Sequence, residues 1–157
     1  MKPATLLFLT ALLAAAPAAA SAEPRVWTLF DDAPQAYLQY GAKRGVDVNA
    51  TQIGCSGRRG VMTVTQSFRH APPRTMGPTA LMTLYSAKRD LEISARARPD
   101  EHDRRRTVLE ADLAAASPMM ASFGRTGDLR LAALGQNVRP PLAPMDLVAR
   151  LLGKCGR

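Results

Sequence analysis

Two cysteines, Cys55 and Cys155, offer the clearest chemistry in the chain, and they are its only cysteines. An even cysteine count in an oxidising compartment predicts a disulfide, here closing a loop of about 100 residues. The alternative is a pair of free thiols for redox or metal chemistry, although the chain has no Cys-x-x-Cys motif. A bonded Cys55 cannot be a nucleophile, which argues against a Cys–His dyad with His70 or His102.

The other patterns that suggest catalysis or metal binding are weak. The segment Gly54-Cys55-Ser56-Gly57 differs from Gly-x-Ser-x-Gly and falls between two expected strands, so it predicts a hairpin turn. His102 lies between two acidic residues in a charged segment. Imidazole and thioether groups suit Cu(I), which makes a copper carrier a third hypothesis. The candidates are His70, Met76, Met82, Met119 and Met120. Their spacing is loose, and Met62, Met82 and Met145 fall at expected core positions.

Basic residues give the chain a formal net charge of +8. Two pairs of arginines form a candidate patch for an anionic partner: Arg58 and Arg59 at an expected hairpin tip, and Arg69 and Arg74 in a proline-rich loop. The pairs flank one expected strand at opposite ends, so they form one patch only if the loop folds back. A further run, 104–106, adjoins acidic residues and is locally neutralised.

Three aromatic residues near the start of the expected mature chain are Trp27, Tyr37 and Tyr40. Packing in the core or at a sheet edge accounts for them. The alternative is an aromatic surface for a glycan or protein partner.

The first 22 residues predict a secretory signal peptide. Met1-Lys2 is a short positive start, an apolar run covers 5–16, and Ala20-Ser21-Ala22 fits a cleavage site. We therefore expect a periplasmic or secreted protein, for which nucleic acid is not an expected partner. No later apolar stretch reaches the length of a membrane helix, so an integral membrane protein is not expected.

Residues 23–157 have the length of a single domain. Their alternating apolar pattern predicts short antiparallel strands, arranged as a β-sandwich or a small barrel. The expected strands are 26–30, 36–40, 46–55, 61–68, 80–85, 91–98, 107–113 and 129–134, with a short piece at Val138 after a turn at 135–137. A change of apolar parity predicts a bulge near Thr51-Gln52.

Two helices are expected late in the chain. Ser117-Pro118 fits an N-cap followed by proline at the first helical position, which predicts a helix over 118–123 ended by Gly124. A terminal helix from Pro144 to Leu152 places Met145, Val148, Leu151 or Leu152, and Cys155 on one face.

Several segments resemble small uncharacterised secreted proteins of alphaproteobacteria. They are Trp27, the run 36–41, Cys55 at a strand end, the segment 123–129, and the final helix ending at Cys155. The stretch Pro118 to Ala133 is similar to the closing segment of invasion-associated locus B proteins. That resemblance implies an exported, β-rich protein linked to host-cell interaction. The chain lacks the extra cysteines usual in that family, and no functional residue of the family can be placed on it.

These patterns together predict an exported, non-enzymatic binding or accessory protein of the cell envelope, with a basic surface and no cofactor. Its expected partner is an envelope protein or an anionic envelope component. The alternative is a secreted inhibitor of an enzyme, using the loop from Arg69 to Pro78.

Overall fold

The computed structural model describes residues 23–31, 35–43, 47–69 and 77–156, which are mainly β. The first four strands are β1 (Arg25–Phe30), β2 (Tyr37–Ala42), β3 (Thr51–Cys55) and β4 (Val61–Phe68). The next three are β5 (Thr79–Ser86), β6 (Arg89–Pro99) and β7 (Thr107–Ala114). The rest are α1 (Pro118–Thr126), β8 (Arg130–Ala133), β9 (Gln136–Val138) and α2 (Met145–Cys155).

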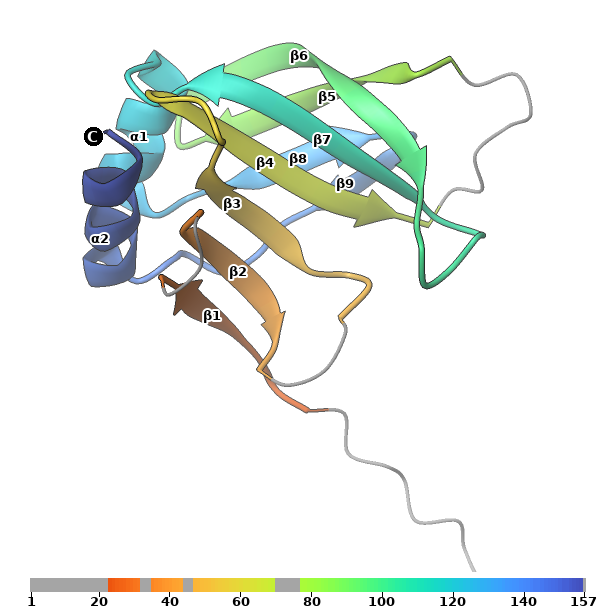
Figure 1. Cartoon of the computed structure of the whole chain (residues 1–157), viewed down its shortest axis with the longest axis horizontal. Coiled ribbons are helices and arrows are strands. Elements are labelled where there is room, and N and C mark those ends of the chain that lie inside the picture. Colours follow the sequence, from red (N-terminus) through yellow and green to blue (C-terminus); the bar gives the residue numbers. More distant parts are fainter. Residues whose placement is uncertain (1–22, 32–34, 44–46, 70–76, 157) are drawn as a thin grey trace, which may run out of the picture.

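All nine strands belong to one sheet, in the order β1-β2-β3-β4-β7-β6-β5-β8-β9. Every neighbouring pair is antiparallel. The sheet is strongly curved into a half-barrel, with β4 and β7 in front of β8 and β9 (Figure 1). The predicted antiparallel β fold with two late helices is confirmed, and its architecture is a single continuous sheet.

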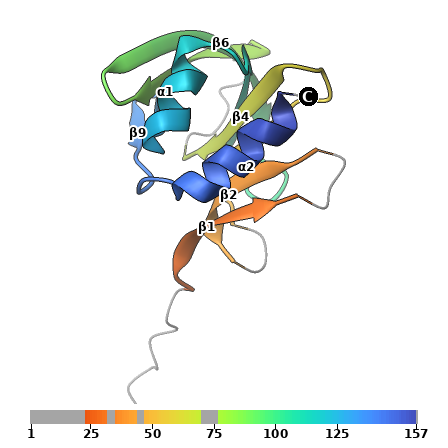
Figure 2. The ribbon, with the colours of Figure 1, turned by 90° about the vertical axis from the view of Figure 1, so that its left-hand side faces the viewer.

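The core fills the concave side of the sheet, because apolar residues alternate along the strands and point inward. Its largest fully buried apolar side chains include Phe68, Leu38, Ile53, Met62, Met82, Leu84, Leu109 and Leu131. The two helices lie side by side across one end of the half-barrel (Figure 2). They contribute Met119, Met120, Phe123, Val148 and Leu151 to the same core.

Two side-chain contacts link early and late parts of the chain. The amide of Gln136 in β9 accepts a 3.2 Å hydrogen bond from the backbone N–H of Arg69 and donates one of 3.2 Å to its carbonyl. The indole N–H of Trp27 in β1 donates a 2.9 Å hydrogen bond to the carbonyl of Pro141. The second contact joins the two ends of the strand order, β1 and the segment after β9, and the first joins the end of β4 to β9.

Helix α1 begins as predicted but ends later. Ser117 is its N-cap and accepts a 3.3 Å hydrogen bond from the N–H of Met120. The prediction that Gly124 ends the helix is wrong, because Gly127 is the C-cap, with φ of 65°. Gly124 instead allows a close helix contact: an added Cβ would lie 2.8 Å from Cδ1 of Leu152 in α2.

Helix α2 buries Val148, Leu151 and Cys155, as its apolar spacing predicts. Met145 is 43% exposed, so its predicted place on the buried face is wrong. Beyond β1, the carboxylate of Asp31 accepts a 2.7 Å hydrogen bond from Arg150, and its carbonyl accepts one of 3.1 Å from Lys154. The helix is therefore tied to the start of the sheet by charge as well as by apolar packing.

The predicted hairpin is present as β3 and β4, with Arg58 and Arg59 in its turn. The predicted strand over 46–50 and its bulge are wrong: residues 47–50 form a turn, and Val46 lies outside the described residues. The carboxylate of Asp47 accepts hydrogen bonds from the backbone N–H groups of Ala42 and Asn49, both 2.8 Å. This side chain competes with strand pairing for the local backbone.

The turn expected at 135–137 is also displaced. Leu134 and Gly135 have φ of 52° and 71°, which suits a two-residue hairpin turn between β8 and β9. Gln136 and Asn137 consequently belong to β9. In the described part of the chain, neither helix has the length and apolar character needed to cross a membrane.

Candidate functional site

The predicted disulfide is confirmed. Cys55 at the end of β3 and Cys155 at the end of α2 are bonded, with their Cα atoms 4.9 Å apart. Neither sulfur is a free thiol, so Cys55 cannot act as the nucleophile of a Cys–His dyad with His70 or His102. The bond fixes the end of β3 that adjoins the turn carrying Arg58 and Arg59.

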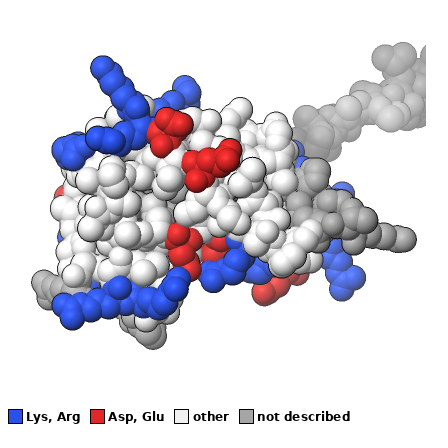
Figure 3. Space-filling view, turned by 90° about the horizontal axis from the view of Figure 1, so that it is seen from above, with Lys and Arg blue, Asp and Glu red and all other residues white. Residues whose placement is uncertain are grey.

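The four arginines of the candidate patch are distributed as follows. Arg58 and Arg59 lie in the turn before β4, and Arg69 follows the other end of that strand. Eight residues of β4 separate them, a span of about 27 Å at the usual rise per residue. Arg74 lies outside the described residues. Figure 3 shows basic side chains on one face of the molecule in separate groups, several of them beside acidic ones.

The structure brings a different set of polar residues together, on the outer face of the sheet. There, β2, β3, β4, β7 and β6 are consecutive neighbours and carry an open groove of about 670 Å³. Its polar lining consists of Gln35, Gln52, Ser56, Thr63, Thr65, Arg96 and Glu110, with Tyr37 at the β2 side. We call this the outer groove. These positions alternate with core residues, so the same pattern that builds the core also builds the groove.

One wall of the outer groove is a row of alternating charges. Arg96 in β6 forms ion pairs with Glu110 of β7 and, at 3.5 Å, with Asp112. Asp112 also accepts hydrogen bonds of 2.7 Å from both Arg58 and Thr63. The hydrogen bond and charge of Glu110, with the charge of Asp112, raise the pKa of Arg96 above its ordinary value. The wall therefore carries fixed charges of both signs.

The floor of the outer groove carries uncharged hydrogen-bonding groups. The side-chain amide of Gln52 in β3 donates a 2.9 Å hydrogen bond to that of Gln39 in β2. Thr65 lies opposite Gln52 on the neighbouring strand β4. Tyr37 lies opposite Gly54 on the neighbouring strand, and its ring stacks on Phe30 with centroids 4.7 Å apart. The floor thus offers amides, hydroxyls and one aromatic ring on a rigid support.

A second hollow of about 300 Å³ continues the outer groove. Gln52 and Thr65 line both. The second hollow is also lined by Gln39, Asp47, Ser67, Arg98, Asp100, Glu101 and His102. His102 is thus placed in this hollow, and its backbone N–H donates a 2.9 Å hydrogen bond to the carboxylate of Asp100.

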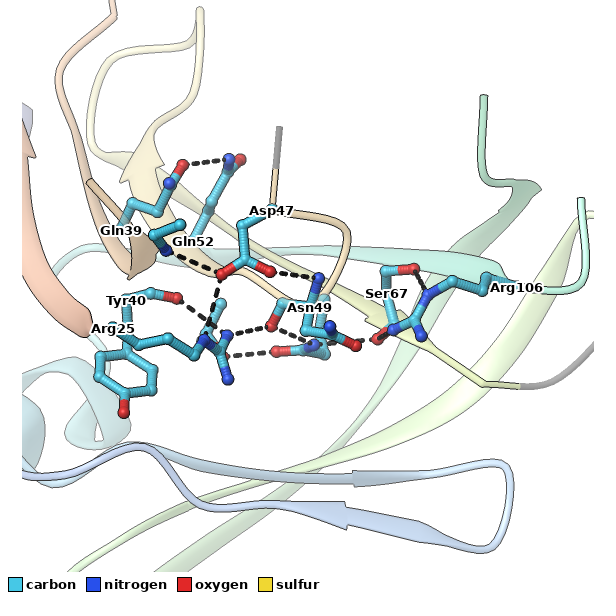
Figure 4. A network of polar contacts seen from close by, with 11 residues as sticks. Arg25, Gln39, Tyr40, Asp47, Asn49, Gln52, Ser67 and Arg106 are labelled. Atoms are coloured by element: carbon cyan, nitrogen blue, oxygen red, sulfur yellow. Dashed lines mark hydrogen bonds and ion pairs between the residues drawn. The ribbon is translucent and has the colours of Figure 1, made fainter. Parts of the chain in front are cut away.

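A network around Asp47 holds residues 47–50, which precede β3, beside this second hollow (Figure 4). Arg25 donates hydrogen bonds of 3.1 Å to the carboxylate of Asp47 and 2.6 Å to the carbonyl of Asn49. Burial opposes the charge of Asp47, but hydrogen bonds from Asn49 and Ala42 and the Arg25 guanidinium outweigh it and lower the pKa of Asp47. Arg25 also lies 4.7 Å from the ring centroid of Tyr40, a cation–π contact.

A second network fixes the other rim, the β6–β7 loop (Figure 4). Ser67 donates a 2.7 Å hydrogen bond to Asp100, and Arg106 donates bonds of 2.9 Å and 2.8 Å to the hydroxyl and carbonyl of Ser67. Asp100 and Arg106 are 6% and 4% exposed, so both are buried although they belong to a charged segment. Buried charges persist when they are paired and hydrogen-bonded, and here each supports the other.

The methionines proposed for a copper site are mostly core residues. Met82, Met119 and Met120 are at most 3% exposed, while His70 and Met76 lie outside the described residues. Within the ranges that the structure describes, no group of three or more His, Cys, Asp or Glu side chains is placed to hold a metal ion. The copper hypothesis gains no support from the described residues.

Sequence reasoning did not single out Gln52, Thr65, Arg96, Glu110 or Asp112 as site residues. The alternation in β6 and β7 does place the last three on the outer face. Their convergence depends on the pairing of β4 with β7 and of β7 with β6, which sets Thr65 opposite Glu110 and Glu110 opposite Arg96. That register was the missing information.

The chain matches no protein-family model, and neither a curated protein nor a solved structure is significantly similar to it. The resemblance to invasion-associated locus B proteins stays a prediction. The function must therefore be argued from the outer groove itself.

Proposed function

We propose that this protein is an exported, non-enzymatic binding or accessory protein of the cell envelope, and that it binds through the outer groove. The observation that carries the proposal is the groove's construction. Most of its lining comes from five neighbouring strands, and its end at β3 is held by the Cys55–Cys155 bond. A binding site on rigid strands loses little conformational entropy when a ligand docks.

The chemistry of the lining favours recognition over catalysis. The described groove residues are amides, hydroxyls and ion-paired side chains, and both cysteine sulfurs are bonded. Nucleophilic catalysis requires an activated nucleophile within reach of a base. Groups already engaged with one another, such as Gln39 with Gln52, suit a preformed polar surface that a ligand covers.

The basic character of the chain supports a location at an anionic envelope. Arg59 is exposed in the turn beside the groove and forms no ion pair with any described residue. The net charge of +8 favours approach to anionic surfaces. In this proposal the basic surface directs the protein to the envelope, and the groove provides the specific contact.

The test is retention on isolated cell envelopes by a variant that fills the groove. In Thr65→Arg, a long side chain enters the floor, opposite Glu110. The matched control is Thr83→Arg on β5, because Thr83 is also half-buried and opposite a glutamate, Glu92, but lies outside the groove lining. We expect Thr65→Arg to reduce retention at least tenfold and Thr83→Arg to leave it unchanged. Equal retention of the Thr65→Arg and Thr83→Arg variants would show that the outer groove is not the binding site.

A further inference from the structure

We propose that the outer groove takes a linear, uncharged oligosaccharide bearing hydroxyl and N-acetyl groups. This inference rests on the proposed function, which it deepens by naming the class of ligand. Three observations point to it: balanced charge along the lining, a floor of amides and hydroxyls beside an aromatic ring, and a length greater than one sugar unit.

The charge balance argues against a polyanion in the groove, although the whole chain is basic. Arg96 is paired with Glu110, and Arg98 with Glu101 at 3.4 Å. The negative charges of the two aspartates in the second hollow are compensated by arginines that lie outside its lining: Arg25 for Asp47 and Arg106 for Asp100. Every cation in the lining therefore has an acidic partner, so the lining offers no excess of positive charge to an anion. An uncharged ligand requires no such excess.

The floor matches the hydrogen bonding of a sugar. A sugar hydroxyl both donates and accepts, and an N-acetyl group offers one N–H and one carbonyl. The amides of Gln35, Gln39 and Gln52 and the hydroxyls of Thr63 and Thr65 likewise donate and accept. The guanidinium of Arg96, which is 63% exposed, keeps N–H donors beyond those used on Glu110 and Asp112.

The aromatic ring of Tyr37 offers an apolar surface on which a sugar ring can pack. The C–H face of a pyranose is apolar and packs on an aromatic ring. Tyr37 lines the groove, and its ring is held by stacking on Phe30 at an interplanar angle of 15°. Gly54 leaves the space that Tyr37 occupies, since an added Cβ would lie 2.7 Å from the Tyr37 Cβ. The ring is thus fixed before a ligand arrives.

The length of the site favours an oligosaccharide over a monosaccharide. The outer groove and the second hollow share Gln52 and Thr65, so they form one continuous depression. Along β4 it reaches at least from Thr63 to Ser67, about 14 Å at the usual strand rise. A monosaccharide would leave most of these groups uncovered.

The experiment is an NMR titration of the purified protein with the pentamer of N-acetylglucosamine. We expect backbone shifts at Gln52, Thr63 and Thr65 and at the side-chain amides of Gln39 and Gln52. The substitutions Gln52→Leu and Thr65→Val should each weaken binding at least fivefold, and Thr83→Val should leave it unchanged. The de-N-acetylated pentamer and an oligogalacturonate should bind at least tenfold more weakly.

The outcomes separate this inference from the proposed function. Preference for oligogalacturonate, or no shift at these residues with the N-acetylated pentamer, would overturn the glycan assignment. If Thr65→Arg still abolished envelope retention, the groove would remain a binding site for another envelope component, such as a peptide. If neither glycan binding nor retention on envelopes depended on the groove, both proposals would be wrong.

Discussion

Tyr37 in β2 lies directly opposite Gly54 in β3, as its register partner. A Cβ at Gly54 would lie 2.7 Å from the Tyr37 Cβ and 2.9 Å from the carbonyl oxygen of Ala36. That carbonyl also accepts a 2.8 Å hydrogen bond from the N–H of Cys55. One missing methyl group therefore allows β2 to approach β3 closely at the end of the outer groove.

We expect Gly54→Ala to destabilise the protein by about 1–3 kcal/mol, the usual cost of overpacking a tight site. The measurement is urea denaturation. The matched control is Gly153→Ala in α2, where an added Cβ has no neighbour within 4 Å. Because alanine favours the helix, that change should stabilise the protein by up to about 1 kcal/mol. If Gly54→Ala were neutral, the close approach would not limit the stability of this part of the sheet.

The Cys55–Cys155 bond should contribute strongly to stability, because it closes a loop with a sequence separation of 100. We expect Cys155→Ser, or reduction of the bond, to lower the free energy of unfolding by about 2–4 kcal/mol. Thermal unfolding with and without reductant measures the effect. The double variant Cys55→Ser/Cys155→Ser should be insensitive to reductant, and an equal response of wild type and double variant would contradict the prediction.

The order of elements could be predicted because each strand carries its own signal. Leu91, Ile93, Ala95 and Ala97 alternate with exposed partners in the sequence and in β6 of the structure. Ser117-Pro118 likewise marks the start of α1. At the end of α1 the sequence does not show the long-range contact: Gly124 lies inside the helix, where it packs closely against Leu152 of α2.

The candidate site was harder to predict for the same reason. The sequence places Arg58 at a hairpin tip in a candidate patch for an anionic partner, and the structure pairs it with Asp112, which is 54 residues away in the sequence. Asp100 and Arg106 lie in a charged segment of the sequence, and Ser67 of β4 joins them in a buried network. A single sequence places such residues on a face or in a loop, and only strand register shows which of them meet.

Asp100 should make stability depend on acidic pH. Burial opposes its charge, but hydrogen bonds from Ser67, His102 and Asp103 and the charge of Arg106 lower its pKa below the ordinary value of 3.8. A carboxyl whose pKa is lower in the folded state contributes stability above its unfolded pKa and loses it as the pH falls. We expect this contribution to be complete above about pH 5 and to decline through the folded pKa.

The measurement is the free energy of unfolding between pH 7 and the acid limit of folding. Asp100→Asn should be less stable than wild type at pH 7, and the difference should shrink as the pH falls below about 4. The control is Glu92→Gln, because Glu92 is exposed and forms no ion pair with a described residue. A constant difference between Asp100→Asn and wild type at all pH values would contradict the assigned role of the carboxylate.

Arg59 should direct the protein to anionic envelope material, since it is exposed beside the outer groove without an ion-pair partner in the described chain. We expect Arg59→Glu to weaken envelope binding roughly fivefold at low salt, which corresponds to a loss of about 1 kcal/mol in binding free energy. The Debye length falls from about 10 Å at 0.1 M salt to about 3 Å at 1 M salt. The difference in envelope binding between Arg59→Glu and wild type should therefore vanish at high salt. Sedimentation with envelopes over a salt series measures it.

The control for Arg59 is Lys88→Glu, which makes the same change of charge in the exposed β5–β6 turn, away from the groove. If the position of the charge matters, Lys88→Glu should reduce binding less than Arg59→Glu. Equal losses would show that only the net charge of the protein counts. A salt-independent loss in Arg59→Glu would instead mean that Arg59 makes a direct contact with the ligand, because screened attraction weakens with ionic strength and a close, desolvated contact does so much less.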